Sequence, residues 1–178
     1  MSRLGGSDQT IGVDNRMAVK RVPVTIGDLA YIPLTKGYVA VIDAADLPLV
    51  AHLNWSVINV RLGQPRARSG RDCLFMHRLI ACPGPGQVVD HANGDTLDNR
   101  RANLRVCSYS QNSANSRRPT HNKSGIKGVG WMKSERKWRA RIQVEGKDMH
   151  LGFFETKEEA AWAYFDAAKR HFGEFARQ

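Results

Sequence analysis

Residues that could carry out chemistry crowd one stretch of this chain, DHANGDTLDNRRANLRVCSYSQNSAN, which runs from Asp90 to Asn115. Hydrolysis of a phosphodiester needs a base that activates water, a hard cation that neutralises charge on the phosphate, and oxygen ligands for that cation. His91 is a candidate base, because histidine titrates near neutral pH. Asp90 and Asn112 are candidate oxygen ligands. The stretch is therefore a candidate site for phosphodiester hydrolysis.

Two other interpretations of this stretch remain open. Asn, Asp and Gly favour turns, so the segment could be a solvated loop with a surface histidine. A zinc site is the second alternative, although the spacing of its ligands fits no standard zinc module. Its ligands would be Cys73, His77, Cys82, His91 and Cys107.

The elements that must position these residues follow in the order strand, loop, strand, helix. We expect a strand at 88–91, a second strand at 104–108, and a helix that begins near Ser108 or Ser110. Neighbouring residues of a regular strand point to opposite faces, so the first strand should end or bulge at His91. In the loop, Asn93 and Asn99 are expected mainly to turn the chain.

The ordered blocks MHR, VVDH, NGD, LDNRRANLR and SQNSAN resemble the HNH nuclease family, specifically its phage-type homing endonucleases, over residues 76–115. The resemblance implies a metal-dependent endonuclease with a ββα-metal core. It implies Asp90 and Asn112 as metal ligands, His91 as the general base, and Asn103 as the residue that orients the histidine or ties the loop together. His77 and Asn115 match the flanks of the motif as candidate site residues.

Oxygen ligands favour Mg²⁺ as the divalent metal, with Mn²⁺ as the alternative. The paired CxxC motifs by which many HNH relatives hold zinc are absent, so we expect no structural zinc. Arg78, Arg100 and Arg105 are candidate phosphate-binding residues, and Arg105 is equally suited to a structural role.

The chain carries 27 Lys and Arg against 17 Asp and Glu, a net charge of +10, which favours a polyanionic partner. Double-stranded DNA is the partner we expect. A non-catalytic DNA-binding regulator with a decayed nuclease centre and an RNA-binding protein are the alternatives. The excess of basic residues is concentrated in residues 117–141, where Glu135 is the single acid. The basic residues of this segment are Arg117, Arg118, Lys123, Lys127, Lys133, Arg136, Lys137, Arg139 and Arg141.

The last 55 residues or so follow their own pattern. Alternation in WRARIQV predicts a strand with Arg139, Arg141 and Gln143 on its outer face. A capping box at Thr156 and Glu159 opens a helix that ends at Gly173. The pattern predicts a three-stranded antiparallel sheet packed on one helix. Its expected core residues are Trp138, Ile142, Leu151, Phe153 and Tyr164.

The motifs KGV, KWRARI, LGFFET and EEAAWAYFDAA in residues 124–175 resemble the plant APETALA/ethylene-response-factor DNA-binding domain. The resemblance implies that the sheet lies in the major groove of DNA. Gly130 stands where that family has Arg, so we do not expect this chain to share the DNA sequence preference of the plant domain. The implied DNA contacts are Lys127, Arg139, Arg141, Gln143 and His150, beside the basic residues Lys133, Arg136 and Lys137.

The predicted fold class is α+β. Its parts are a flexible arm at 1–20, a β-rich N-terminal scaffold at 21–75, the nuclease core at 76–116, a basic linker at 117–124 and the DNA-binding domain at 125–178. In the scaffold we expect a hairpin at 30–43, a short helix at 45–55, and strands at 55–61 and 73–80.

Three widely spaced cysteines argue against a disulfide framework and favour a reducing cytoplasm, that of the host cell if a phage encodes the chain. No apolar segment is long enough to span a membrane. We expect a monomer or a weak dimer.

Overall fold

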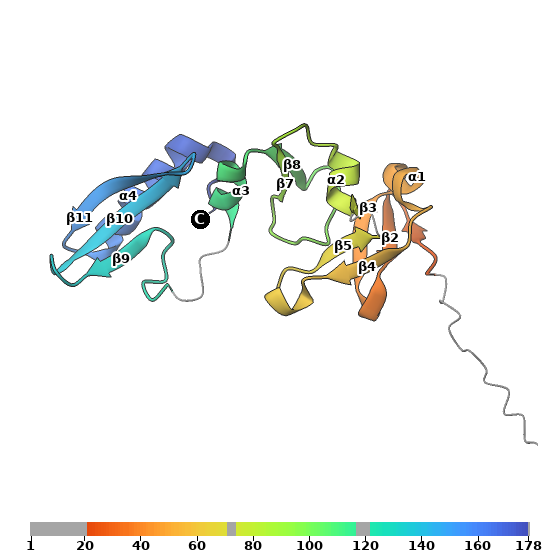
Figure 1. Ribbon diagram of the computed structural model, residues 1–178, viewed down its shortest axis with the longest axis horizontal. Coiled ribbons are helices and arrows are strands. Elements are labelled where there is room, and N and C mark those ends of the chain that lie inside the picture. The colour runs from red at the N-terminus through yellow and green to blue at the C-terminus, as the bar shows by residue number, and fades with distance from the viewer. Residues whose placement is uncertain (1–20, 71–73, 117–121, 178) are drawn as a thin grey trace, which may run out of the picture.

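The structure, a computed structural model, describes residues 21–70, 74–116 and 122–177. The chain forms an elongated molecule in which three parts follow one another along the long axis (Figure 1). They are the N-terminal scaffold, the segment at 76–116 that resembles HNH nucleases, called the nuclease motif below, and the C-terminal part from residue 122 onwards. Its described strands pair into small antiparallel sheets joined by short helices, which agrees with the predicted α+β class. Of the helices in the described part, none is long and apolar enough to cross a membrane.

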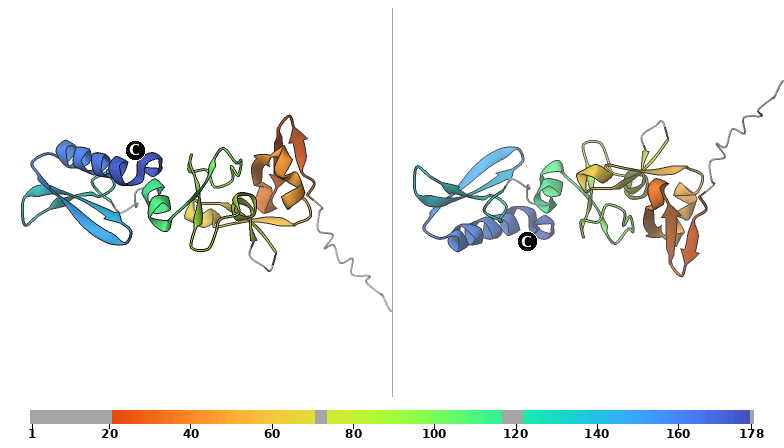
Figure 2. Two further views of the ribbon diagram at one scale, coloured as in Figure 1. Left: turned by 90° about the horizontal axis from the view of Figure 1, so that it is seen from above. Right: turned by 90° about the horizontal axis from the view of Figure 1, so that it is seen from below.

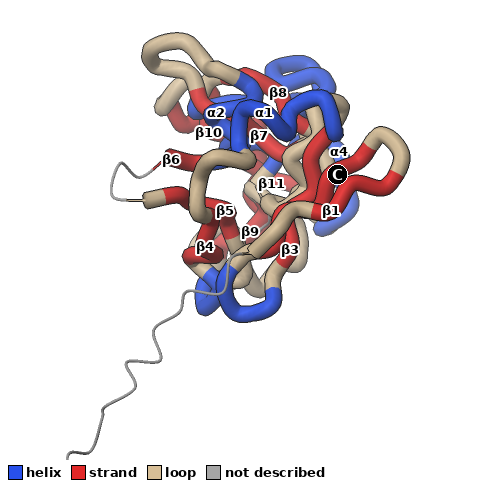
Figure 3. Tube along the Cα trace, turned by 90° about the vertical axis from the view of Figure 1, so that its right-hand side faces the viewer, coloured by secondary structure: helices blue, strands red, loops and turns tan. Residues whose placement is uncertain are grey.

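Two three-stranded sheets make up the N-terminal scaffold. One contains β1 (Val24–Ile26), β2 (Leu29–Pro33) and β3 (Val39–Asp43), and the other contains β4 (Trp55–Ile58), β5 (Arg66–Ser69) and β6 (Leu74–Phe75). The predicted hairpin is confirmed, since β2 and β3 pair around the 3-10 turn η1 (Thr35–Gly37). The short helix predicted at 45–55 is present but ends at Val50, as η2 (Ala44–Asp46) followed by α1 (Leu47–Val50). A further 3-10 turn, η3 (Val60–Leu62), leads towards β5. Figure 3 views this end of the molecule.

The strand predicted at 73–80 is wrong beyond Phe75, because the chain turns there into helix α2 (Met76–Ala81). Met76 and Ile80, four residues apart, lie on one face of this helix and are both buried in the scaffold core. Strand β5 lies between the strands expected at 55–61 and 73–80, in a segment where we predicted no strand. Its sequence RARS is mostly polar, yet Ala67 and Ser69 are buried by the period-2 alternation of the strand.

The nuclease motif consists of β7 (Val88–His91), β8 (Leu104–Cys107) and α3 (Tyr109–Asn115), which confirms the predicted order of elements. As expected, β7 ends at His91. Helix α3 begins where predicted, since Ser108 and Gln111 form a reciprocal capping box at its first turn.

The loop between β7 and β8 is fixed to the scaffold. The backbone of Val41 in β3 exchanges hydrogen bonds with Leu97 (2.9 Å) and Asn99 (2.7 Å). Beyond them, the guanidinium of Arg101 binds the buried carboxylate of Asp46 at 2.7 Å. The loop that holds candidate site residues is thus positioned by the N-terminal sheet.

In the C-terminal part, strands β9 (Val129–Met132), β10 (Lys137–Val144) and β11 (Lys147–Phe154) form an antiparallel sheet in the order β11-β10-β9. Helix α4 (Lys157–Phe172) packs on one face of this sheet and is followed by the 3-10 turn η4 (Gly173–Phe175), as Figure 2 shows. The capping box at Thr156 and Glu159 is confirmed, as is the end of the helix at Gly173.

The prediction that Phe153 is a core residue of this part is wrong. Phe153 is 43% exposed, because it lies opposite Arg139 on the outer face of the sheet. Phe154, opposite Trp138, packs against the core in its place. A register shift near Ala140 accompanies this arrangement, and a single-residue shift exchanges the two faces of a strand.

The second hydrophobic core crosses from the nuclease motif into the C-terminal part. Cys107 of β8 and Ala114 of α3 belong to the same buried cluster as Val129, Ile142 and Tyr164. One side of α3 is therefore covered by the predicted DNA-binding part. The predicted arm, most of the basic linker, and Arg117 and Arg118 lie outside the described residues.

Candidate active site

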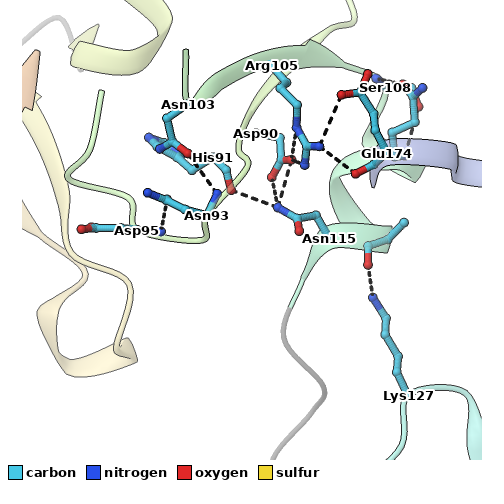
Figure 4. A network of polar contacts seen from close by, with 12 residues as sticks. Asp90, His91, Asn93, Asp95, Asn103, Arg105, Ser108, Asn115, Lys127 and Glu174 are labelled. Carbon is cyan, nitrogen blue, oxygen red and sulfur yellow. Dashed lines mark hydrogen bonds and ion pairs between the residues drawn. The ribbon is translucent and has the colours of Figure 1, made fainter. Parts of the chain in front are cut away.

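Asp90, only 5% exposed, lies near the end of β7, and its carboxylate is held from two sides (Figure 4). Arg105, its cross-strand partner on β8, donates from Nη2 (2.5 Å) and Nε (3.2 Å) to Asp90 Oδ2. Asn115 of α3 donates from Nδ2 to both carboxylate oxygens, at 2.9 and 3.0 Å. The strand pair and the helix together fix the orientation of this carboxylate.

His91 is buried next to it, and the Nε2 atom of its ring lies 3.2 Å from Asn99 Oδ1. The Asn99 amide donates from Nδ2 to Leu97 O, which turns its oxygen towards the histidine. An amide oxygen only accepts hydrogen bonds, so it favours the tautomer protonated at Nε2 and leaves Nδ1 as the proton acceptor.

Burial lowers the pKa of His91 below its usual 6.5, and the hydrogen bond to Asn99 opposes this shift. His91 is therefore neutral at pH 7, the form that a general base requires. The backbone at His91 is also fixed, since its carbonyl oxygen accepts from Asn115 Nδ2 (3.0 Å) and from Gly94 N (2.8 Å).

Asn103 lies under the loop and ties its two ends together. Its Oδ1 accepts from the backbone N–H of Asn93 (2.9 Å), and its Nδ2 donates to the carbonyl of Asp98 (2.7 Å). Of the two roles that the family resemblance implies for Asn103, these contacts favour loop tying. The partner of the His91 ring is Asn99, which we interpreted mainly as a turn residue. No spacing rule in the sequence distinguishes Asn99 from the other loop asparagines.

A cavity of about 160 Å³ brings the candidate residues together. The ring of His77 lies 5.2 Å from that of His91, and burial lowers the pKa of His77 to about 3. The cavity also contains two arginines that sequence reasoning missed, Arg66 and Arg177. The candidate site residues that line it are His77, Asp90, His91, Asn112 and Asn115.

The cavity holds two groups whose oxygens are of the kind that binds a hard divalent cation, the Asp90 carboxylate and the Asn112 amide. Asp90 offers carboxylate oxygens, and Asn112 is a half-buried residue whose amide has no hydrogen-bond partner among the described side chains. Within the described residues, no group of three or more His, Cys, Asp or Glu side chains could hold a metal ion. Mg²⁺ suits a site with one carboxylate, because this ion is often bound by one or two carboxylates together with substrate phosphates.

The basic residues predicted to contact phosphates near the motif have partners within the protein. Arg78 Nη1 lies 3.4 Å from Gln87 O, and Arg100 binds Asp98 through Nε (2.7 Å) and Nη2 (2.6 Å). Arg105 holds Asp90, so it has the structural role that we considered as its alternative. Their predicted DNA contacts stay predictions.

On the C-terminal sheet, Arg139, Arg141, Gln143 and Lys133 line one surface cavity of about 810 Å³. Arg136 and His150 are exposed, and Lys137 forms an ion pair with Glu155 at 2.8 Å. Of these predicted DNA-binding residues, Lys133, Arg139, Arg141 and Gln143 therefore share one surface of the C-terminal part.

Lys127 differs from these residues, because its amine is directed to helix α3. It donates to the carbonyl oxygens of Ser113 (2.5 Å), Ala114 (3.0 Å) and Ser116 (3.3 Å) at the end of that helix. Burial lowers the pKa of Lys127. Its predicted DNA contact stays a prediction, while the structure gives it a stabilising contact with the helix that carries Asn112 and Asn115.

Similarity to known proteins includes the stretch of the chain that forms this site. A family model described as HNH endonuclease matches residues 75–114, which include the candidate site from His77 to Asn112. No solved structure matches the chain.

Two viral proteins are similar over longer stretches. The chain is 36% identical over 100 residues to Protein 3.8 of Escherichia phage T7, a match that covers 54% of this chain and 82% of the relative. It is 34% identical over 148 residues to the uncharacterized HNH endonuclease L560 of Acanthamoeba polyphaga mimivirus, covering 79% of this chain and 74% of the relative. With the motif, the strand and helix order and these relatives in agreement, this chain belongs to the HNH endonuclease family.

Proposed function

We propose that this chain is a metal-dependent DNA endonuclease of the homing type, which hydrolyses phosphodiester bonds in duplex DNA. The observation that carries the proposal is the single cavity lined by Asp90, His91 and Asn112. The C-terminal part, with its resemblance to the APETALA/ethylene-response-factor domain, would select the site of cleavage. The enzyme would act as a monomer or weak dimer in the cytoplasm of the infected host.

In this mechanism His91 takes a proton from water at Nδ1, and the resulting hydroxide attacks phosphorus in line. Asn99 holds the required tautomer through Nε2. Asp90 and Asn112 would hold a divalent cation, Mg²⁺ or Mn²⁺, which supplies charge stabilisation at the departing 3′ oxygen. Asn103 keeps the loop between β7 and β8 in place around His91.

DNA binding by the C-terminal sheet rests on its outward basic residues. Arg139 and Arg141 are the best placed to read base edges, since a forked guanidinium matches the acceptors of guanine in the major groove. The flanking lysines would neutralise phosphates without reading sequence.

The test is incubation of supercoiled plasmid with the full chain, with and without Mg²⁺ or Mn²⁺. We expect metal-dependent loss of supercoiled DNA, and nicked and linear products report whether one or two strands are cut. His91→Ala should abolish cleavage and retain duplex binding. His52→Ala is the matched control, because His52 is exposed and lies outside the cavity. Cleavage by His91→Ala at the rate of the unaltered chain would overturn the assignment of the base.

One observation favours the alternative of a DNA-binding regulator without catalysis. Both carboxylate oxygens of Asp90 already accept hydrogen bonds from Asn115, and Oδ2 also binds Arg105. A cation would have to share this carboxylate with two protein donors. Tight duplex binding with intact plasmid over a full titration of Mg²⁺ and Mn²⁺ would support the regulator.

A further inference from the structure

Two arginines from distant parts of the sequence meet in the cavity beside His91. Arg66 comes from β5 of the N-terminal scaffold, and Arg177 follows η4 of the C-terminal part. Neither residue belongs to the nuclease motif or to the outer face of the C-terminal sheet. Their presence gives the cavity one wall from each neighbouring part of the protein.

The Arg66 guanidinium contains the one buried side-chain nitrogen or oxygen in the described part that lacks a hydrogen-bond partner, its Nε. A buried donor without an acceptor is energetically unfavourable. Arg66 lines the same cavity as His77 and His91. An acceptor that enters the cavity would satisfy this donor.

Arg177 lies over the loop that follows His91. Its Nη1 is so close to Gly94 that a Cβ atom at that glycine would lie 2.7 Å away. The guanidinium makes no hydrogen bond or ion pair with another described residue. The backbone before it is fixed by Arg105, which donates to Glu174 O at 2.8 Å and lies 4.3 Å from the centre of the Phe175 ring.

The charges around the cavity favour an anion. Asp90 is the one carboxylate among the described residues that line it, and Arg105 already neutralises that group. The charges of Arg66 and Arg177 therefore have no free carboxylate partner among the described residues that line this small cavity.

We propose that Arg66 and Arg177 bind the phosphate at which cleavage takes place, from two sides of the cavity. This inference rests on the proposed function and extends it: the nuclease motif supplies the base and the metal ligands, whereas the scaffold and the C-terminal part supply the phosphate-binding residues. Guanidinium groups suit this role because their paired N–H donors match phosphate oxygens.

The test combines binding and cleavage. In a His91→Ala background, binding of a fluorescent DNA duplex is measured by anisotropy over a range of salt concentrations. We expect Arg66→Ala and Arg177→Ala each to reduce the slope of log K against log salt by about 0.9, the value for one phosphate contact. In the active background, each variant should lower the single-turnover cleavage rate about 100-fold or more, as loss of one transition-state donor does.

Arg170→Ala is the matched control, because its side chain is 71% exposed, pairs with Asp166 on α4 and lies outside the cavity. Arg66→Lys and Arg177→Lys should keep the salt slope of the His91→Ala protein and still lose cleavage in the active background. Lysine retains the positive charge but lacks the paired N–H donors of a guanidinium. Circular dichroism on each variant separates loss of binding from loss of folding. A folded Arg66→Lys protein keeps the test valid if Arg66→Ala unfolds.

The outcomes separate this inference from the proposed function. If the unaltered chain cleaves DNA and both alanine variants keep its salt slope and its rate, the phosphate-binding role is overturned and the nuclease assignment stands. If the unaltered chain cleaves nothing with any metal, the proposed function fails. A reduced salt slope in both variants would then still support phosphate binding in the cavity.

Discussion

Arg105 and Asp90 face each other across the β7–β8 pair, and the guanidinium Nη2 lies 2.5 Å from the buried carboxylate. The same guanidinium binds the backbone of Glu174 in η4. One side chain therefore neutralises the candidate metal ligand and joins the nuclease motif to the C-terminal part.

Replacing Arg105 by Met should destabilise the protein. The substitution leaves the Asp90 carboxylate buried with Asn115 as its remaining side-chain donor, and breaking a buried ion pair on one side costs about 3 kcal/mol or more. Urea unfolding followed by circular dichroism measures this loss. Arg170→Met, which removes an exposed pair on α4, should have little effect. Equal stability of the two variants would show that Arg105 does not anchor Asp90.

Replacing Asn103 by Asp should loosen the loop around His91. The new carboxylate cannot donate to Asp98 O, and its oxygen would repel that carbonyl at a separation now of 2.7 Å. We expect a stability loss of about 1–3 kcal/mol and a marked fall in plasmid cleavage. Asn54→Asp, at an exposed position of the scaffold, is the control. Full activity of Asn103→Asp would show that the loop does not depend on this donor.

Gly128 should not tolerate a side chain. It has a φ of +73°, and a Cβ atom there would lie 2.3 Å from the Tyr164 ring and 2.4 Å from Arg141 O. Gly128→Ala should therefore lower the free energy of unfolding by about 2 kcal/mol or more, through overpacking and backbone strain. At Gly130, two residues on, an added Cβ meets nothing within 4 Å. Gly130→Ala should leave thermal unfolding unchanged, so similar losses in both variants would contradict the prediction.

The stability of the protein should fall in acid through His77. Its pKa is about 3 when folded, against 6.5 for an ordinary histidine, with burial as the main cause and the charges of His91, Arg66 and Arg78 adding to it. Between pH 6.5 and 3 the unfolded chain binds a proton at this position that the folded protein does not. Stability is therefore full above pH 6.5 and decreases as the pH falls towards 3, by at most about 1.4 kcal/mol per pH unit.

His77→Gln removes this titration, so its urea midpoint should decline less between pH 6.5 and 4 than that of the unaltered chain. His150→Gln, at an exposed residue of β11, serves as the control and should keep the original pH dependence. If the urea midpoints of His77→Gln and the unaltered chain declined equally with pH, His77 would not cause the loss of stability in acid.

Local patterns in the sequence predicted much of the architecture, because they depend on neighbours along the chain. The strand that ends at His91, the helix start near Ser108, the capping box at Thr156 and the alternating strand of WRARIQV were all predicted from short-range rules. The helix at 76–81 was missed because it does not depend on a local pattern. Met76 and Ile80 lie on one helical face that is buried by the scaffold core, which is a tertiary contact.

The sequence by itself determined which residues could carry out chemistry, since Asp90, His91 and Asn112 have the right functional groups in the right order. Only the tertiary structure decided their partners. Asn99 reaches the His91 ring through the folding of a loop against Val41, and Arg105 holds Asp90 through strand register. Arg66 and Arg177 lie in the cavity because three parts of the chain pack together, a contact between distant segments that local periodicity does not encode.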